Sequence, residues 1–128
     1  MTQHFDATSP IYLQLGDRIK RRIIRGELAP GARLPSVREM AVDAGLNPNT
    51  VQRTYADLEA SGITVKQRGL GTFVTEDADV LRQLREHMKS RQIAEFVGQM
   101  ETIGCGRSEI IAGVRSYIEE RESGNDSI

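Results

Sequence analysis

The fold of this chain is decided by two consecutive stretches, LPSVREMA at residues 34–41 and GLNPNTVQR at residues 45–53. In the first stretch, Ser36 and Glu39 have the spacing of a capping box, in which each side chain accepts a hydrogen bond from the other residue's backbone N–H. A helix is therefore expected to begin at Val37. Its apolar residues recur at helical spacing, so one face of this helix is suited to burial.

The residues between this helix and the next are suited to a tight corner. Gly45 can take the left-handed backbone conformation that commonly ends a helix. Asn47 can then cap a second helix, and Pro48 suits its first position because the N–H that proline lacks would have no helical partner there. The sequence thus predicts two short helices joined by a sharp turn.

The second helix has two different faces. Its buried face is expected to consist of Val51, Thr54, Tyr55 and Leu58. The opposite face carries Asn49, Gln52, Arg53 and Ala56. Amide and guanidinium groups read base edges in the DNA major groove, and the second helix of a helix-turn-helix places them there. The alternative is an ordinary helical corner whose polar face meets only solvent.

A further helix is expected before these two. It starts at Ser9-Pro10, and its apolar side chains recur at helical spacing at Tyr12, Leu15, Ile19 and Ile23. Each of the three helices is followed by a glycine that can end it, namely Gly26, Gly45 and Gly62. This repetition supports the helix boundaries independently of the hydrophobic pattern.

Beyond Gly62 the pattern changes to that of two short strands. Residues 63–67 and 72–75 are rich in β-branched side chains, and the glycines between them suit a tight hairpin. A lone hairpin is marginally stable in water, so it must pack on the helices. The residues expected to anchor it are Ile63, Val65 and Phe73. Three helices followed by a hairpin predict a winged helix.

The tip of this hairpin is cationic. Lys66 and Arg68 can lie along a phosphate backbone or enter a minor groove. The alternative is a solvated loop whose charges are incidental. The helix-turn-helix beside it favours the DNA-binding interpretation.

Residues 78–122 are expected to form two further helices that serve for dimerisation. A long helix starting at Asp77 or Asp79 is broken by GCG at residues 104–106, and a last helix is capped by Ser108. An apolar stripe left uncovered usually marks an interface, and twofold dimers are the commonest oligomers. The residues assigned to this interface are Leu81, Leu84, Met88, Phe96, Val97, Met100, Ile110 and Val114.

The composition restricts the class of protein. A chain of 128 residues with a net charge of -1 corresponds to about one domain with a small appendage, and any basic surface must be local. The sequence has no signal-peptide pattern and no run of ~20 apolar residues, so no membrane segment is expected. Cys105 is the single cysteine, which fits a reducing cytoplasm. The polar ends, residues 1–9 and 123–128, are expected to be mobile.

Other kinds of chemistry find little support. His4 and His87 are isolated from other metal ligands, so neither a metal site nor a cofactor is expected. Cys105 is either a redox-sensing thiol or, more often for such a residue, an incidental loop cysteine. The glycines at residues 69–71 lead from strand to strand rather than into a helix, unlike a phosphate-binding loop. No catalytic set stands out, so no enzyme activity is expected.

Several ordered motifs resemble the GntR family of bacterial transcription regulators. They are PGxRLPSxRExA from residue 30, NPNTVxR from residue 47 and GxGTFV from residue 69. The opening PIY at residues 10–12 and the NPNTV segment look most like the YtrA subfamily. The match covers residues 10–77. The short two-helix C-terminus is also similar to that subfamily, whose members are dimeric and lack a large effector domain.

The resemblance implies DNA contacts at particular positions. Arg38 matches the arginine of the family's LPSxR motif and would contact DNA near the groove edge. Arg68 and Gly69 match the wing tip, which reaches the minor groove in relatives. The start of the recognition helix, where relatives touch phosphates and bases, is occupied by Asn47, Asn49, Thr50 and Gln52.

This chain departs from many family members outside the subfamily at two positions. Those members carry arginines where this chain has Pro48 and Gln52. Bidentate reading of guanine is therefore not available at these positions, and Arg53 or Arg38 is the candidate to replace it.

The sequence therefore predicts a mainly α fold with a small β-hairpin. A winged helix-turn-helix DNA-binding domain spans residues 10–77, and a two-helix dimerisation segment spans residues 78–122. Phosphate contacts are assigned to Arg33, Ser36, Arg38, Thr50 and Arg68. Base contacts are assigned to Asn49, Gln52 and Arg53.

We expect a cytoplasmic homodimeric transcription regulator, a repressor, that binds a twofold double-stranded DNA operator. Subfamily relatives often control transporter operons, which is an analogy. The sequence identifies no small-molecule effector. The alternative is a winged-helix protein-interaction module without specific DNA binding. Some GntR relatives carry an aminotransferase-like domain, but this chain has no room for one.

Overall fold

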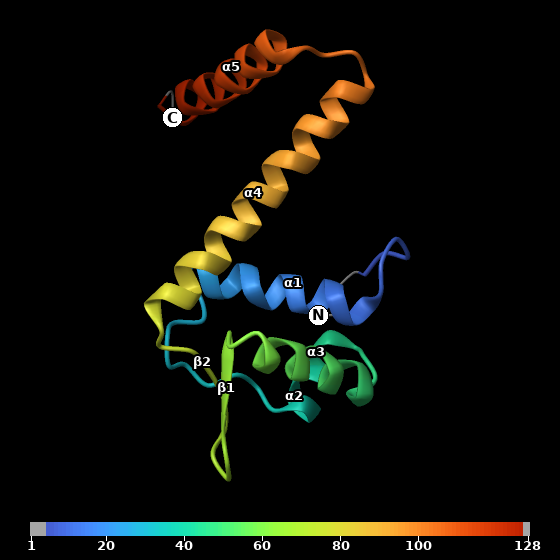
Figure 1. The fold of residues 1–128 in the computed structure, drawn as a ribbon, viewed down its shortest axis with the longest axis vertical. Coiled ribbons are helices and arrows are strands. Elements are labelled where there is room, and N and C mark those ends of the chain that lie inside the picture. The colour runs from blue at the N-terminus through green and yellow to red at the C-terminus, as the bar shows by residue number, and fades with distance from the viewer. Residues whose placement is uncertain (1–4, 127–128) are drawn as a thin grey trace. The chain divides into compact units, whose positions relative to one another are not determined.

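The structure is a computed structural model that describes residues 5–126. The chain divides into two compact units, one ending at Glu86 and the other beginning at His87. In chain order the elements are α1 (Ile11–Ile24), α2 (Val37–Ala44), α3 (Pro48–Ala60), β1 (Thr64–Gln67), β2 (Gly71–Val74), α4 (Ala78–Thr102) and α5 (Arg107–Asp126) (Figure 1). This confirms the expected mainly α fold with one antiparallel hairpin. The division between the units falls within α4, whereas the sequence placed a boundary before Ala78.

The corner between α2 and α3 forms as the sequence predicts. Ser36 and Glu39 make the capping box, since the Ser36 Oγ accepts from the Glu39 N–H at 3.1 Å and the Glu39 Oε1 accepts from the Ser36 N–H at 3.3 Å. Gly45 ends α2 in the left-handed conformation, with φ of 69°. The Asn47 Oδ1 caps α3 by accepting a hydrogen bond from the Asn49 N–H at 2.8 Å.

The core of the first unit is formed around α3. Helices α1 and α2 both contact α3, and β1 contacts it as well (Figure 1). Burial of its apolar face removes a large hydrophobic area from water, which is the main favourable term in folding. The most deeply buried side chains of this unit include Leu15, Ile19, Leu34, Val51, Leu58 and Val74.

Two polar side chains of α3 tie it to its neighbours. The Tyr55 hydroxyl donates to the Pro35 carbonyl oxygen at 2.7 Å, just before α2 begins. The Thr54 Oγ1 donates to the Tyr12 carbonyl oxygen of α1 at 2.8 Å. Both residues are buried, so these hydrogen bonds satisfy polar groups that would otherwise lose their water partners.

The hairpin is attached to the segment that precedes α2. Strands β1 and β2 pair antiparallel, with Thr64 opposite Val74. Residues 31–34 pair with the other edge of β2, because the Leu34 N–H donates to the Thr72 carbonyl oxygen at 2.8 Å and the Val74 N–H donates to the Ala32 carbonyl oxygen at 2.8 Å. Strand β2 therefore has hydrogen-bonded partners on both sides.

One of the expected hairpin anchors is wrong. Ile63 is buried and Phe73 is partly buried, but Val65 is 45% exposed. Successive side chains of a strand point to opposite faces, so burial of Thr64 turns Val65 outward. Val74, which pairs with Thr64, is buried in its place.

The chain ends also differ from expectation. Residues 5–9 fold against α1 rather than forming a mobile arm: the Arg18 guanidinium lies 4.0 Å above the Phe5 ring, and the Asp6 N–H donates to Gln14. Helix α1 starts at Ile11, just after the expected start at Ser9-Pro10, and Pro10 provides no side-chain cap. The remaining expected mobile residues, 1–4 and 127–128, lie outside the described residues.

The two C-terminal helices keep the expected break but not the expected ends. Gly104, with φ of 88°, follows α4 as predicted. Helix α5 starts at Arg107, so Ser108 lies inside it and is not its cap; the Ile110 N–H donates to the Gly106 carbonyl oxygen at 3.0 Å. Residues 123–126, expected to be disordered, continue α5. None of the helices in the described part of the chain combines the length and apolarity needed to cross a membrane.

We predict that Tyr55→Phe destabilises the fold by about 1 kcal/mol at pH 7, because the Pro35 carbonyl loses its donor. Burial, assisted by the Glu39 carboxylate, raises the pKa of Tyr55 from 10.0 to about 12. Its proton is therefore held more tightly in the folded state, and the resulting stability is fully present below pH 10 and is lost as the pH rises toward 12.

Urea unfolding of both proteins across this alkaline range would measure the effect. The free energy of unfolding should fall more steeply with pH for the wild type than for Tyr55→Phe. Parallel pH profiles would show that Tyr55 does not hold its proton in this way.

Candidate nucleic-acid interface

The outward face of α3 carries the polar side chains that the sequence assigned to base contacts. Asn49, Gln52 and Arg53 are all exposed, while the opposite face of the helix is buried in the core. Amide and guanidinium groups on one solvent-facing surface of a helix can form bidentate hydrogen bonds with base edges. The helix thus presents a face of suitable chemistry for the major groove.

The residues at the start of α3 are more constrained. The Asn47 side chain is occupied as the helix cap, so its carbonyl oxygen already accepts from the Asn49 N–H. Its amide N–H₂ group can still donate. Thr50 is only partly exposed. Asn47 and Thr50 can therefore contact only groups that come close to the N-terminal end of α3.

The start of α2 contributes a second set of groups. Ser36 is exposed and its oxygen is an acceptor in the capping box, which leaves its hydroxyl hydrogen free to donate. Arg38 is exposed one residue inside the helix. Positive charge beside a helix N-terminus, where backbone N–H groups lack helical partners, gives an environment that attracts phosphate.

The wing contributes a third set. The Leu70 N–H donates to the Gln67 carbonyl oxygen at 2.9 Å, and Gly69 has φ of 80°, so a β-turn requiring a glycine closes the tip. Lys66 and Arg68 are exposed there. No carboxylate within residues 5–126 forms an ion pair with Arg38, Lys66 or Arg68, so these cations are available to an anionic partner.

Arg33 lies at the base of the wing, against Gly71. A Cβ atom on Gly71 would stand 2.8 Å from the Arg33 Nε, closer than van der Waals contact allows. Glycine at position 71 therefore makes room for the Arg33 side chain, in addition to adopting φ of 127°. The structure places Arg33, the start of α2, the outward face of α3 and the wing in the same compact unit.

One contact at this interface was not found from the sequence. The Arg53 guanidinium lies 3.8 Å from the centroid of the Tyr12 ring, and its Nη2 donates to the Tyr12 hydroxyl at 3.0 Å. The sequence assigned Tyr12 only to the apolar face of α1. Because 41 residues separate the two positions, no local pattern indicates their contact.

The expected dimerisation residues fall into three groups. Leu84, Met88 and Ile110 are buried within the single chain and so are little exposed to a partner. The partly exposed residues are Leu81, Val97 and Met100. Phe96 and Val114 are exposed at 41% and 38%. The exposed large apolar residues of this segment that the assignment omitted are Ile93, Ile103, Ile111, Tyr117 and Ile118.

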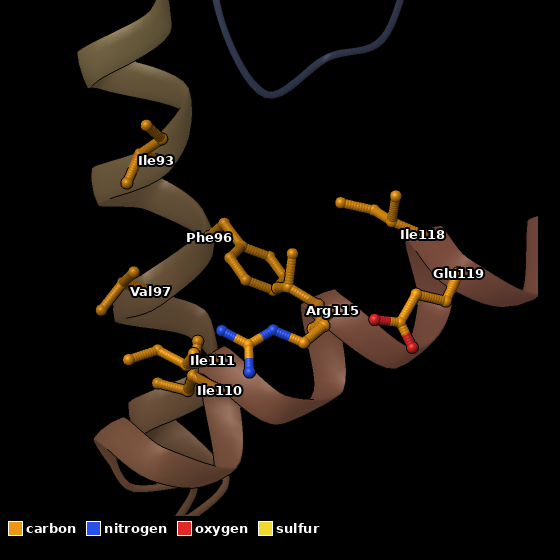
Figure 2. Close-up of a pocket in the computed structure, with 9 residues that line it drawn as sticks. Ile93, Phe96, Val97, Ile110, Ile111, Arg115, Ile118 and Glu119 are labelled. Atoms are coloured by element: carbon orange, nitrogen blue, oxygen red, sulfur yellow. The ribbon is translucent and has the colours of Figure 1, made fainter. Parts of the chain in front are cut away.

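Within the unit that begins at His87, α4 and α5 enclose an apolar groove of about 570 Å³. Figure 2 shows Phe96 and Ile118 pointing toward the space between the two helices, with Ile110 and Ile111 at its closed end. Among the described residues, the charged side chains that line it are Arg115 and Glu119. A groove of this composition is suited to apolar side chains rather than to nucleic acid.

Metal and thiol chemistry are not supported by the described residues. Within residues 5–126, no three metal-ligating side chains come together. Burial, together with the nearby Glu109 carboxylate and a hydrogen bond to it, raises the pKa of Cys105. A raised pKa leaves less of the thiol as the reactive thiolate, so the structure adds no support for a redox sensor.

Three helices, a wing and an exposed polar face on the second helix of the corner define a winged helix-turn-helix. Residues 11–74 match the family described as bacterial regulatory proteins, gntR family. The chain is also 42% identical over 119 residues to the uncharacterized HTH-type transcriptional regulator YhcF of Bacillus subtilis, covering 93% of this chain and 98% of YhcF. This protein belongs to the GntR family of transcription regulators.

Two further relatives agree with this assignment. The HTH-type transcriptional repressor YtrA of Bacillus subtilis is 35% identical over 117 residues, covering 85% of this chain and 90% of YtrA. A solved structure of a GntR family transcriptional regulator from Listeria monocytogenes is similar with a TM-score of 0.82 and 37% identity, covering 88% of this chain and 98% of that one. The resemblance inferred from the motifs is therefore confirmed at the level of the family, with YtrA among the similar proteins.

Proposed function

We propose that this protein is a homodimeric repressor that binds a twofold DNA operator through its winged helix-turn-helix. The observation that carries the proposal is the outward face of α3, where Asn49, Gln52 and Arg53 are exposed opposite a buried face. Its position, as the second helix of the corner, matches that of a recognition helix. The similarity to YtrA, which is named a repressor, supports the direction of regulation.

The contacts divide into those that position the protein and those that read sequence. Phosphate contacts come from the segment before α2, the start of α2, the start of α3 and the wing, through Arg33, Ser36, Arg38, Thr50 and Arg68. Base contacts come from Asn49, Gln52 and Arg53 in the major groove. A repressor of this kind acts sterically, because the occupied operator is closed to other proteins.

The groove between α4 and α5 supports the proposed dimerisation. A single winged helix has a small footprint, whereas two copies on a twofold axis occupy half-sites about 34 Å apart and combine their affinities. The exposed apolar residues of the unit beginning at His87, such as Phe96, Val114 and Ile118, supply a surface that a second copy can cover. The proposed domain organisation is therefore a DNA-binding winged helix at residues 10–77 followed by a dimerisation segment at residues 78–122.

The proposed setting is the cytoplasm, and the proposed target is a transporter operon. A single cysteine fits a reducing cytoplasm, and control of a transporter operon remains an analogy with the subfamily. The competing function is a protein-interaction module in which the groove binds a different protein. Salt-dependent and sequence-selective DNA retention distinguishes the regulator from such a module.

We predict that Gln52→Ala changes discrimination at particular base pairs of a selected duplex, at a cost of about 1–3 kcal/mol there, because the amide can be bidentate. Duplexes would be selected from a randomised library by the wild-type protein, and each base pair would then be substituted in turn. A uniform loss over all sequences would remove Gln52 from the reading residues.

The matched control is Arg38→Ala. It should weaken binding to every duplex and reduce the slope of log affinity against log salt by about one unit, because one phosphate contact is lost. A wild-type protein that retains no duplex would contradict the proposed function itself.

We predict that Phe96→Glu shifts the protein from dimer to monomer and lowers its affinity for a two-half-site duplex far more than for a single half-site. The charge would be introduced at the mouth of the apolar groove, where a partner would have to desolvate it. The control is Ala94→Glu, which adds the same charge to α4 at an exposed residue that does not line the groove.

Sedimentation would measure the oligomeric state of both variants, and DNA retention would be measured on the same samples. If Phe96→Glu stays dimeric, the groove is not the dimer interface.

A further inference from the structure

We propose that Tyr12 is a positioning residue for DNA recognition, which holds the Arg53 guanidinium in one place on the outward face of α3. This inference rests on the proposed function, in which α3 reads DNA. It adds a residue of α1, a helix with no assigned role in recognition, to the groups that determine sequence preference.

Two contacts of different kinds hold Arg53. Its guanidinium lies over the Tyr12 ring, 3.8 Å from the centroid, and its Nη2 donates to the Tyr12 hydroxyl at 3.0 Å. The ring contact restrains the position of the guanidinium, and the hydrogen bond to the hydroxyl restrains its orientation. Arginine otherwise has many accessible rotamers, so the combination selects one of them.

The backbone of Tyr12 is itself hydrogen-bonded to α3, at the residue that follows Arg53. Its carbonyl oxygen accepts the hydrogen bond from the Thr54 Oγ1 at 2.8 Å, and Thr54 is 1% exposed. The backbone of Tyr12 is thus held by a buried group adjacent to Arg53 in sequence. The ring that supports the guanidinium therefore moves with the recognition helix rather than independently of it.

The contact places Arg53 beside the other recognition residues. Tyr12 and Arg53 line a hollow of about 380 Å³ with Ile11, Asn49 and Thr50. The guanidinium is held at the α1 side of α3, toward the start of the helix. The contact with the ring uses none of its N–H donors, and the tyrosine hydroxyl accepts from one of the five, so donors remain for DNA.

A guanidinium held in this way favours sequence preference over general affinity. A free Arg53 can reach phosphates on any duplex, which adds binding without discrimination. An Arg53 side chain held by Tyr12 can contact only the DNA groups that lie within reach of its fixed position. It also loses less conformational entropy on binding, because its rotamer is already selected. Loss of Tyr12 should therefore reduce the preference for a selected duplex more than it reduces binding to arbitrary DNA.

The test uses the full chain and two substitutions at one position. Tyr12→Leu removes both contacts, whereas Tyr12→Phe keeps the ring and removes only the hydroxyl. Binding would be measured to a duplex selected from a randomised library by the wild type, and to a random-sequence duplex of the same length. We expect Tyr12→Leu to reduce the preference between them about tenfold and Tyr12→Phe to reduce it by about threefold.

Two further measurements separate positioning from a general structural role. In an Arg53→Ala background, Tyr12→Leu should cause no further loss of preference, because its effect passes through Arg53. In NMR spectra the δ-methylene protons of Arg53 should be shifted upfield by the ring in the wild type and in Tyr12→Phe, and should lose that shift in Tyr12→Leu.

The proposal is overturned by an equal loss in the Arg53→Ala background, by unchanged or increased preference in Tyr12→Leu, or by an unshifted Arg53 in the wild type. Should Tyr12→Leu not fold, Tyr12→Phe decides: it must keep the ring shift and lose preference, and an unchanged preference overturns the role of the hydroxyl. A wild type without any sequence preference overturns the proposed function as well, and so is distinguishable from a failure of Tyr12 alone.

Discussion

The rest of the structure depends on the packing of α3, whose one face is buried in the core and whose opposite face is exposed to solvent. Helices α1 and α2 and strand β1 all contact this helix, and its Thr54 and Tyr55 fasten it to α1 and to the segment before α2. Because these hydrogen bonds lie in the core, small rotations of α3 would leave buried polar groups without partners. The buried hydrogen bonds on one face of α3 therefore determine which of its residues are exposed on the other face. They also hold α3 rigidly enough to present those exposed side chains to a partner.

Much of this arrangement could be predicted from sequence because it is set locally. The capping box at Ser36 and Glu39, the Asn47 cap and the glycines after the helices act over a few residues, so short motifs specify them. The exposed face of α3 followed from helical periodicity alone. The assignment to the GntR family likewise depended on short ordered motifs and agreed with the comparison over residues 11–74.

The remaining features depend on contacts that no local pattern reports. The contact of Arg53 with Tyr12 joins two helices, and the local sequence pattern explains each residue without that contact. Val65 was misplaced because an alternating pattern leaves open which set of residues faces the core. Ser108 was misread as a cap because the helix begins before it, at Arg107, where the Gly106 carbonyl oxygen accepts from the Ile110 N–H.

The pairing of residues 31–34 with β2 restricts insertions and deletions within that segment. Insertion of one residue there would turn the buried Leu34 toward solvent, since a strand exposes alternate side chains, and would also rotate the start of α2 with its Arg38. The tip at residues 68–70 is restricted differently, because all three of its residues are exposed and none packs in the core. A change of length at the tip should therefore leave the core intact and alter only the turn and the position of Arg68, whereas a change of length in the segment that joins the wing to α2 should disturb the core itself.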